Sequence, residues 1–70
     1  MPIIIAPVNK QLRIVRIAAD EKLKKHLESL GITINGEIMV LNSSGRDVVC
    51  KIKDAKIALD GELSTKIFVA

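Results

Sequence analysis

The sequence predicts a mainly β domain: a small, strongly bent barrel of about five short strands, with one short α-helix inserted after the first strand and a helical turn before the last. Three observations lead to this fold class. Phe68 is the single aromatic residue in a chain that is 49% hydrophobic, so the core must be built from Ile, Val and Leu, which favour strands. The apolar residues form short runs bounded by turn-forming residues. Helical spacing dominates only in residues 20–30.

Length and composition indicate one small domain over residues 1–70. The single cysteine cannot form an internal disulfide, and the sequence lacks a Cys/His metal-binding spacing, so we expect a reducing, cytoplasmic setting. The apolar run at residues 2–8 is too short to span a bilayer and has no basic region ahead of it. We therefore expect neither direct membrane insertion nor a signal peptide.

The first part of the chain is expected to be extended. Residues 1–9 are predicted to form an extended lead-in, because Pro7 keeps Ala6 out of the helical region. Residues 12–17 form the first clear strand. Their apolar positions do not alternate cleanly, so we expect a bend or a β-bulge within this strand.

The helix follows this strand and has clear end signals. Its apolar stripe recurs at i, i+4 and i+7: Leu23, Leu27 and Leu30. Asp20 can cap the first turn. Gly31 can end the helix in the left-handed conformation, with Leu27 and Ile32 as the apolar pair that closes such a cap. A helix this short is not stable alone in water. It is therefore predicted to be a lid that packs on the strands.

Four more strands are expected after the helix, at residues 37–41, 47–52, 56–59 and 66–69. Their connections are a turn at Asn35-Gly36, a turn at residues 42–46, a tight connection at residues 53–55, and a helical turn over residues 61–65 that Asp60 caps. The helix thus interrupts a run of short strands.

Some of these strands are apolar on both faces. Ile38 and Val40 point one way and Met39 and Leu41 the other, and residues 67–69 show the same pattern. One face fills the barrel, and the helix can cover part of the second face. Apolar surface that the helix leaves bare would be a patch for binding a partner.

Three parts of the sequence share their order and spacing with a known family: residues 13–17, residues 27–32 followed by Gly36, and residues 57–59 with 67–69. Over about residues 11–70 they resemble the FeoA family, the small cytosolic accessory proteins of bacterial ferrous-iron transport. The family has an SH3-like barrel fold, which agrees with the strand pattern. The chain departs from the family in two turns, because it lacks a glycine both at Asn9-Lys10 and at Asp54-Ala55.

The resemblance implies a non-enzymatic cytoplasmic regulator that needs no cofactor and binds the cytosolic part of the membrane transporter FeoB at the inner face of the membrane. Two alternatives stay open. One is a nucleic-acid-linked or metal-responsive module, such as the SH3-like domain of iron-dependent repressors, although the chain has no helix-turn-helix. The other is a homo-oligomeric adaptor, which self-association without another ligand would reveal.

The residue inventory gives little for chemistry. One His, one Cys and no nucleophile motif provide no catalytic residue, and no glycine-rich loop is placed to cradle a phosphate. His26 lacks companion ligands and is expected at the rim of the lid. Cys50 shares a strand face with Val48 and Ile52, which indicates a small core residue. We therefore expect no catalytic, cofactor or metal site.

Positive charge is concentrated early in the chain, since residues 1–25 contain six basic and two acidic side chains. Nucleic-acid binding is not expected, because proteins that bind single strands stack bases on aromatic rings and this chain has only Phe68. The charge can equally be an ordinary solvated surface. If a partner binds, we expect it on the lid, at Lys22, Leu23, Lys24, Lys25 and Leu27. The second candidate is the outer barrel face, at Met39, Leu41 and Val49. Three residues are expected to be structural: Gly31, Gly36 and Cys50.

Overall fold

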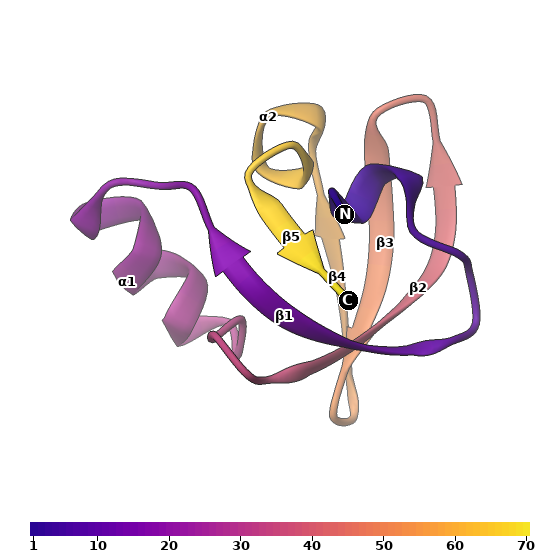
Figure 1. Cartoon of the computed structure of the whole chain (residues 1–70), viewed down its shortest axis with the longest axis horizontal. Coiled ribbons are helices and arrows are strands. Elements are labelled where there is room, and N and C mark those ends of the chain that lie inside the picture. Colours follow the sequence, from indigo (N-terminus) through magenta and orange to yellow (C-terminus); the bar gives the residue numbers. More distant parts are fainter.

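Five antiparallel strands form one curled sheet in the order β4-β3-β2-β1-β5 (Figure 1). This is the arrangement in the computed structural model, which describes residues 1–70. The strands are β1 (Gln11–Ile17), β2 (Glu37–Ser44), β3 (Asp47–Ile52), β4 (Ala55–Leu59) and β5 (Ile67–Val69). The predicted fold class is confirmed, with the helix inserted after the first strand and a helical turn before the last.

Two bulges bend the strands. The register between β1 and β5 shifts between Ile14 and Arg16, at the irregularity predicted for the first strand. A second shift, between Val40 and Asn42, was not predicted. Beyond it β2 stays paired with β3 as far as Ser44, so the connecting turn is shorter than the predicted residues 42–46. The residues after the bulge are polar and so lack the alternating pattern that predicts a strand. They pair all the same, because backbone hydrogen bonds between strands do not depend on apolar side chains.

Both helices begin at an aspartate. In α1 (Glu21–Ser29) the Asp20 carboxylate accepts the backbone N–H three residues further on at 2.8 Å. In α2 (Gly61–Ser64) Asp60 accepts the equivalent N–H at 2.9 Å. Each aspartate satisfies a backbone donor that has no partner within the helix. Both predicted caps are therefore present.

The end of α1 ties the helix to the core. Gly31 has a φ of 94°, and the Ile32 N–H donates to the Leu27 carbonyl at 2.9 Å. These features form the expected left-handed cap, and its apolar pair, Leu27 and Ile32, is fully buried. Leu23 is half-buried against the core, whereas Leu30 is 37% exposed. The buried stripe is thus narrower than the three leucines predicted.

The left-handed residue of the following turn is Asn35, with a φ of 70°, and not Gly36. Asparagine tolerates this conformation better than most residues. Gly36 is needed for space, since a Cβ there would lie 3.0 Å from the carbonyl oxygen and from Oγ1 of Thr33. Asn9 also has a positive φ, of 60°, and so takes the place of the turn glycine that the family commonly has.

The expected extended lead-in is wrong for Ile3–Ile5, which form a short 3₁₀ helix, η1. Pro7 does keep Ala6 extended, with a ψ of 150°, but this restriction acts on one residue only. The residues before Ala6 are not restricted in this way, and their 3₁₀ helix buries Ile3 completely. Burial of that side chain, a tertiary effect, decides the conformation.

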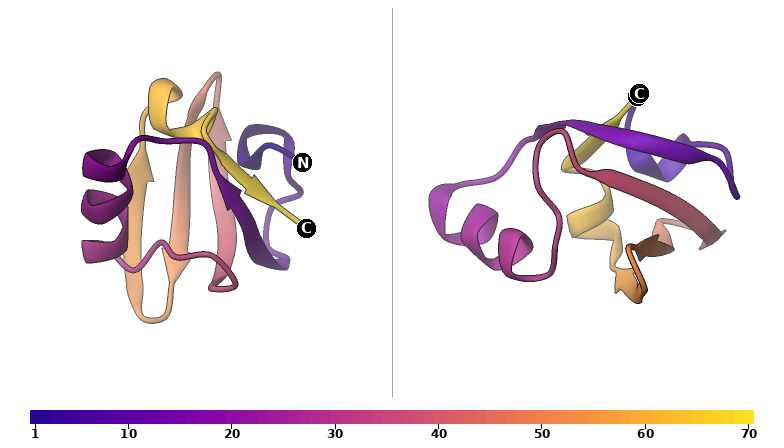
Figure 2. Two further views of the ribbon diagram at one scale, coloured as in Figure 1. Left: turned by 60° about the vertical axis from the view of Figure 1, so that its left-hand side comes forward. Right: turned by 90° about the horizontal axis from the view of Figure 1, so that it is seen from below.

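The N-terminus seals one edge of the sheet. The Met1 ammonium donates to the Val69 carbonyl at 2.8 Å, and the Val69 N–H donates to the Met1 carbonyl at 2.7 Å. Pro2 forms a bridge with Phe68 next to them. Figure 2 shows α1 on the side of the molecule away from the N-terminus. The core lies between these two sides and contains fourteen buried apolar residues.

Candidate functional site

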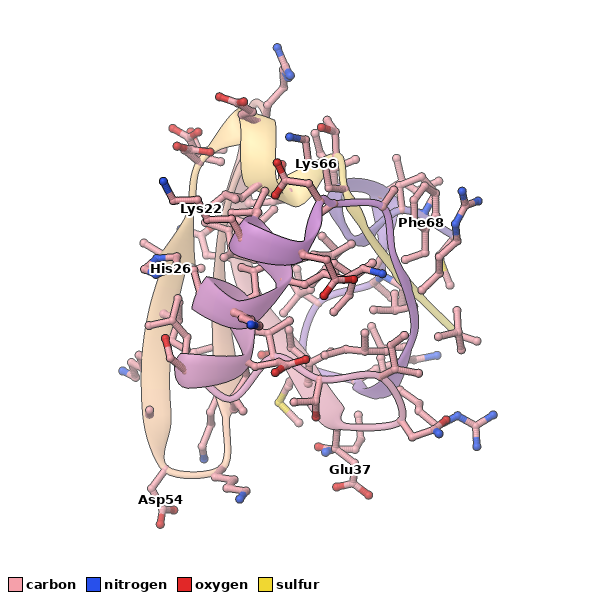
Figure 3. All side chains as sticks on the ribbon, turned by 90° about the vertical axis from the view of Figure 1, so that its left-hand side faces the viewer. Lys22, His26, Glu37, Asp54, Lys66 and Phe68 are labelled. Atoms are coloured by element: carbon pink, nitrogen blue, oxygen red, sulfur yellow. The ribbon has the colours of Figure 1, made fainter.

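The basic surface of α1 faces outward, toward the viewer of Figure 3. Lys22, Lys25 and His26 are exposed and Lys24 is half-buried. Figure 3 shows Lys22 and His26 projecting from the same side of the helix. The lysines predicted to form a rim thus all lie on α1, while their role in binding a partner stays a prediction.

The apolar centre expected inside this rim is small. Leu27 is fully buried and makes part of the core, which removes it from the candidate partner surface. Its position follows from the helix cap, because the cap directs Leu27 and Ile32 inward together. Leu23 remains half-buried, and Leu30 in the last turn is exposed. A partner that binds α1 would thus meet lysines first and little apolar surface.

The three residues of the second candidate surface lie on the neighbouring strands β2 and β3, since Leu41 directly precedes Asn42, the partner of Val49, and Met39 pairs with Lys51, two positions from Val49. Met39 and Leu41 are half-buried, and Val49 is 36% exposed. Met39 lines a hollow at the end of the barrel near the end of α1. Val49 lines a different hollow of about 260 Å³ on the outer face of β3 and β4, together with Ala58. Alternation along β2 predicted which side chains point outward, but not that Met39 and Val49 line different hollows.

The hollow at the end of the barrel has a volume of about 590 Å³ and was not predicted. It carries charges of both signs: Glu28, Glu37, Lys51 and Lys53. Its rim is partly fixed, because the Gln11 side-chain amide donates to Glu37 at 2.8 Å. These residues belong to segments far apart in the sequence, so no local pattern could have indicated them.

Cys50 is fully buried, and its thiol donates to the Ile57 carbonyl at 3.5 Å. Burial raises the pKa of this thiol from 9.0 to about 11. The thiol is therefore neutral at physiological pH, and a neutral thiol is a poor nucleophile and metal ligand. No group of three or more His, Cys, Asp or Glu side chains is arranged to hold a metal ion.

The FeoA domain family model matches the whole of residues 1–70. The chain belongs to the FeoA family. The family identified from the sequence is thereby confirmed, and with it an association with ferrous-iron transport as an accessory protein. No helix of this FeoA-family chain has the length and apolar character needed to cross a membrane. A comparison with curated proteins finds no match.

Solved structures of FeoA proteins share the fold. A crystal structure of an iron uptake regulatory protein, FeoA, superposes with a TM-score of 0.88 at 20% identity, covering 99% of this chain and 93% of that one. Iron(II) transport protein A from Clostridium thermocellum gives a TM-score of 0.87 at 25% identity. That comparison covers 99% of this chain but 44% of the Clostridium chain. A FeoA-like protein from Clostridium acetobutylicum gives 0.81 at 14% identity, over 100% of this chain and 84% of the other.

Proposed function

We propose that this FeoA-family chain regulates ferrous-iron transport by binding the cytosolic part of the transporter FeoB, without catalysing a reaction. The observation that carries the proposal is the match of the FeoA domain to the full length of the chain. Binding to FeoB would bring the protein to the inner face of the membrane. The neutral, buried Cys50 thiol is consistent with a role that does not depend on covalent chemistry.

The lysines of α1 are the proposed first contact with the transporter. Lys22, Lys24 and Lys25 lie on one short helix that projects from the sheet (Figure 2). Charges at the rim of an interface chiefly accelerate association, and salt screens their effect. Leu23, half-buried beside these lysines, supplies the apolar contact that the buried Leu27 cannot.

Charge reversal tests both the binding to FeoB and the proposed contact through the lysines of α1. The double substitution Lys24→Glu and Lys25→Glu is expected to weaken binding to the purified cytosolic part of FeoB by roughly three- to tenfold in low salt, and by less in high salt. A matched control, Lys10→Glu with Arg13→Glu, makes the same change in net charge at exposed positions before and in β1. Thermal melts should show that both variants fold.

Ferrous-iron uptake is then measured in cells that lack the endogenous protein. Uptake should return with the parent chain and with the β1 control, and return less with the α1 variant. Equal rescue by both variants would locate the contact away from α1. Normal uptake in cells without the protein would contradict the proposed function itself.

A further inference from the structure

The two outer edges of the sheet differ in their backbone pairing. The edge at β5 pairs with Met1 and Pro2, and both backbone hydrogen-bonding groups of Val69 are used there. The edge at β4 pairs with β3 on one side and with no strand on the other. Figure 3 shows β4 as the outermost strand on its side of the molecule. The β4 edge is therefore the place where the sheet can accept another strand.

The register identifies the free backbone groups of β4. β3 and β4 are joined by the two residues Lys53 and Asp54, so Ile52 and Ala55 must be a hydrogen-bonded pair. The register continues without a shift, and hydrogen-bonded pairs alternate with non-bonded pairs. Cys50 with Ile57 is therefore bonded, whereas the pairs that contain Lys56 and Ala58 are not.

It follows that the N–H and C=O groups of Lys56 and Ala58 point away from β3. Turns, loops and caps use neither residue in a backbone hydrogen bond. Two donors and two acceptors thus lie in line, about 7 Å apart along the strand. An antiparallel segment can satisfy all four in two hydrogen-bonded pairs, and recognition by strand addition uses this geometry.

Proteins usually protect a free edge with a proline, a bulge, a covering element or a charge. The β4 strand has a regular register and no proline, and Lys56 is its only charged residue. Both Lys56 and Ala58 are exposed. The small Ala58 side chain leaves the hollow beside Val49 open. This edge is thus protected by one lysine alone.

The charges around the lower part of β4 favour an acidic occupant. Lys56 lies opposite Lys51 across the pair, and Lys53 lies in the adjoining turn. Lys22 and His26 project from α1 on the same side of the molecule (Figure 3). Asp54 is the one acidic residue in the connection between β3 and β4, and Asp47 and Asp60 lie at the other end of β4, where they line the hollow that receives an apolar side chain. In a second copy of this chain, the lysines Lys51, Lys53 and Lys56 would approach those of the first copy, and these like charges oppose pairing between two β4 strands.

We propose that the β4 edge binds an extended acidic segment in the cytosolic part of FeoB, which adds to the sheet as an antiparallel strand. This inference rests on the proposed function. In the antiparallel direction, the residue opposite Ala58 comes two positions before the residue opposite Lys56. The segment therefore carries an apolar residue that enters the hollow beside Val49, and two positions later an Asp or Glu that pairs with Lys56.

The substitution Ala58→Pro tests strand addition selectively. It removes an outward N–H and no hydrogen bond to β3, and edge strands tolerate proline at such a position. Binding to the purified cytosolic part of FeoB should weaken by roughly tenfold or more. The matched control Ala58→Ser retains the N–H and should bind within about twofold of the parent chain. Lys56→Glu should also weaken binding, and less so in high salt.

Amide hydrogen exchange of the unsubstituted chain provides a second measurement, which stands even if Ala58→Pro fails to fold. The amides of Lys56 and Ala58 should exchange rapidly in the free protein and slowly in the complex, while that of Ile57 is slow in both. Binding that leaves the first two amides fast, or that survives Ala58→Pro unchanged, overturns strand addition and leaves the proposed function standing. If the amides of Lys56 and Ala58 become protected as the protein concentration rises in the absence of FeoB, the edge pairs with a second copy of the chain and the proposed strand addition is overturned. No binding at all contradicts the proposed function.

Discussion

The β5 edge of the sheet is sealed by residues from the N-terminus, whereas the β4 edge pairs with no further strand. The sealed edge combines backbone pairing with the complete burial of Ile3. The open edge has no such covering strand, and Lys56 and Ala58 are exposed on it. The difference shows that one small sheet closes one of its edges with its N-terminus and leaves the other edge without a further strand.

The largest effect is expected from opening the sealed edge. Ile3→Ala should lower the free energy of unfolding by about 2–5 kcal/mol, because it removes most of a fully buried side chain and leaves a cavity. The control Ile5→Ala changes the same residue type within the same 3₁₀ helix, at a position that is 69% exposed. It should change stability by less than about 0.5 kcal/mol. Equal denaturation midpoints for the two variants would contradict the role of Ile3.

The open side should respond to alkaline pH through Cys50. Its thiol has a pKa of about 11 in the folded protein against 9.0 when unfolded. The unfolded chain therefore loses its proton first as pH rises. The contribution of Cys50 is fully present below pH 9 and is lost as pH rises to about 11, a loss of roughly 2–3 kcal/mol.

Urea denaturation between pH 8 and 11 measures this effect. The variant Cys50→Ala should be less stable than the parent below pH 9, and its stability should fall less steeply between pH 9 and 11. A thiol reagent should react slowly with the native protein and quickly in denaturant. An identical pH slope in both proteins, or rapid reaction in native buffer, would be inconsistent with a buried thiol.

The smallest of the three stability effects concerns the cap that holds α1. Gly31→Val should destabilise the domain by roughly 1–2 kcal/mol, because the φ of 94° is strained for a β-branched residue. The added Cβ would also lie 3.2 Å from Cγ2 of Ile52. Gly31→Asn, a residue that enters the left-handed region more easily, is the control and should cost less. Chemical denaturation of both variants measures these changes. A Gly31→Val midpoint equal to that of the parent would show that the cap does not contribute to stability.

Local features of the fold could be predicted from the sequence, and the site could be predicted only in part. The caps at Asp20, Asp60 and Gly31 depend on neighbouring residues, so their patterns are visible in the chain. The alternation over Asp47–Ile52 likewise gave the inward face of β3, where Val48, Cys50 and Ile52 are buried. The lysines of α1 were assigned to a surface helix for the same reason.

The remaining features depend on contacts between distant segments. Burial of Ile3 turns a lead-in that reads as extended into a 3₁₀ helix. The bulge near Leu41 lets polar residues continue β2, where composition alone predicts a turn. The availability of Lys56 and Ala58 follows from the position of β4 at the end of the sheet. The order of strands in the sheet depends on the whole chain, so the residues of β4 alone do not indicate that this strand lies at an edge.

The sealed edge also has a consequence for the order in which the chain folds. Its terminal contact joins Met1 to Val69, 68 positions apart, whereas β3 and β4 are joined by the two residues Lys53 and Asp54. Closing the longer loop costs more entropy, so we expect the β2–β3–β4 meander to be formed in the folding transition state and the terminal contact to form afterwards. In a chevron plot, Ile3→Ala should then mainly accelerate unfolding and leave the folding arm nearly unchanged. The residues that close the barrel would thus set the lifetime of the native state and have little influence on the rate at which it is reached.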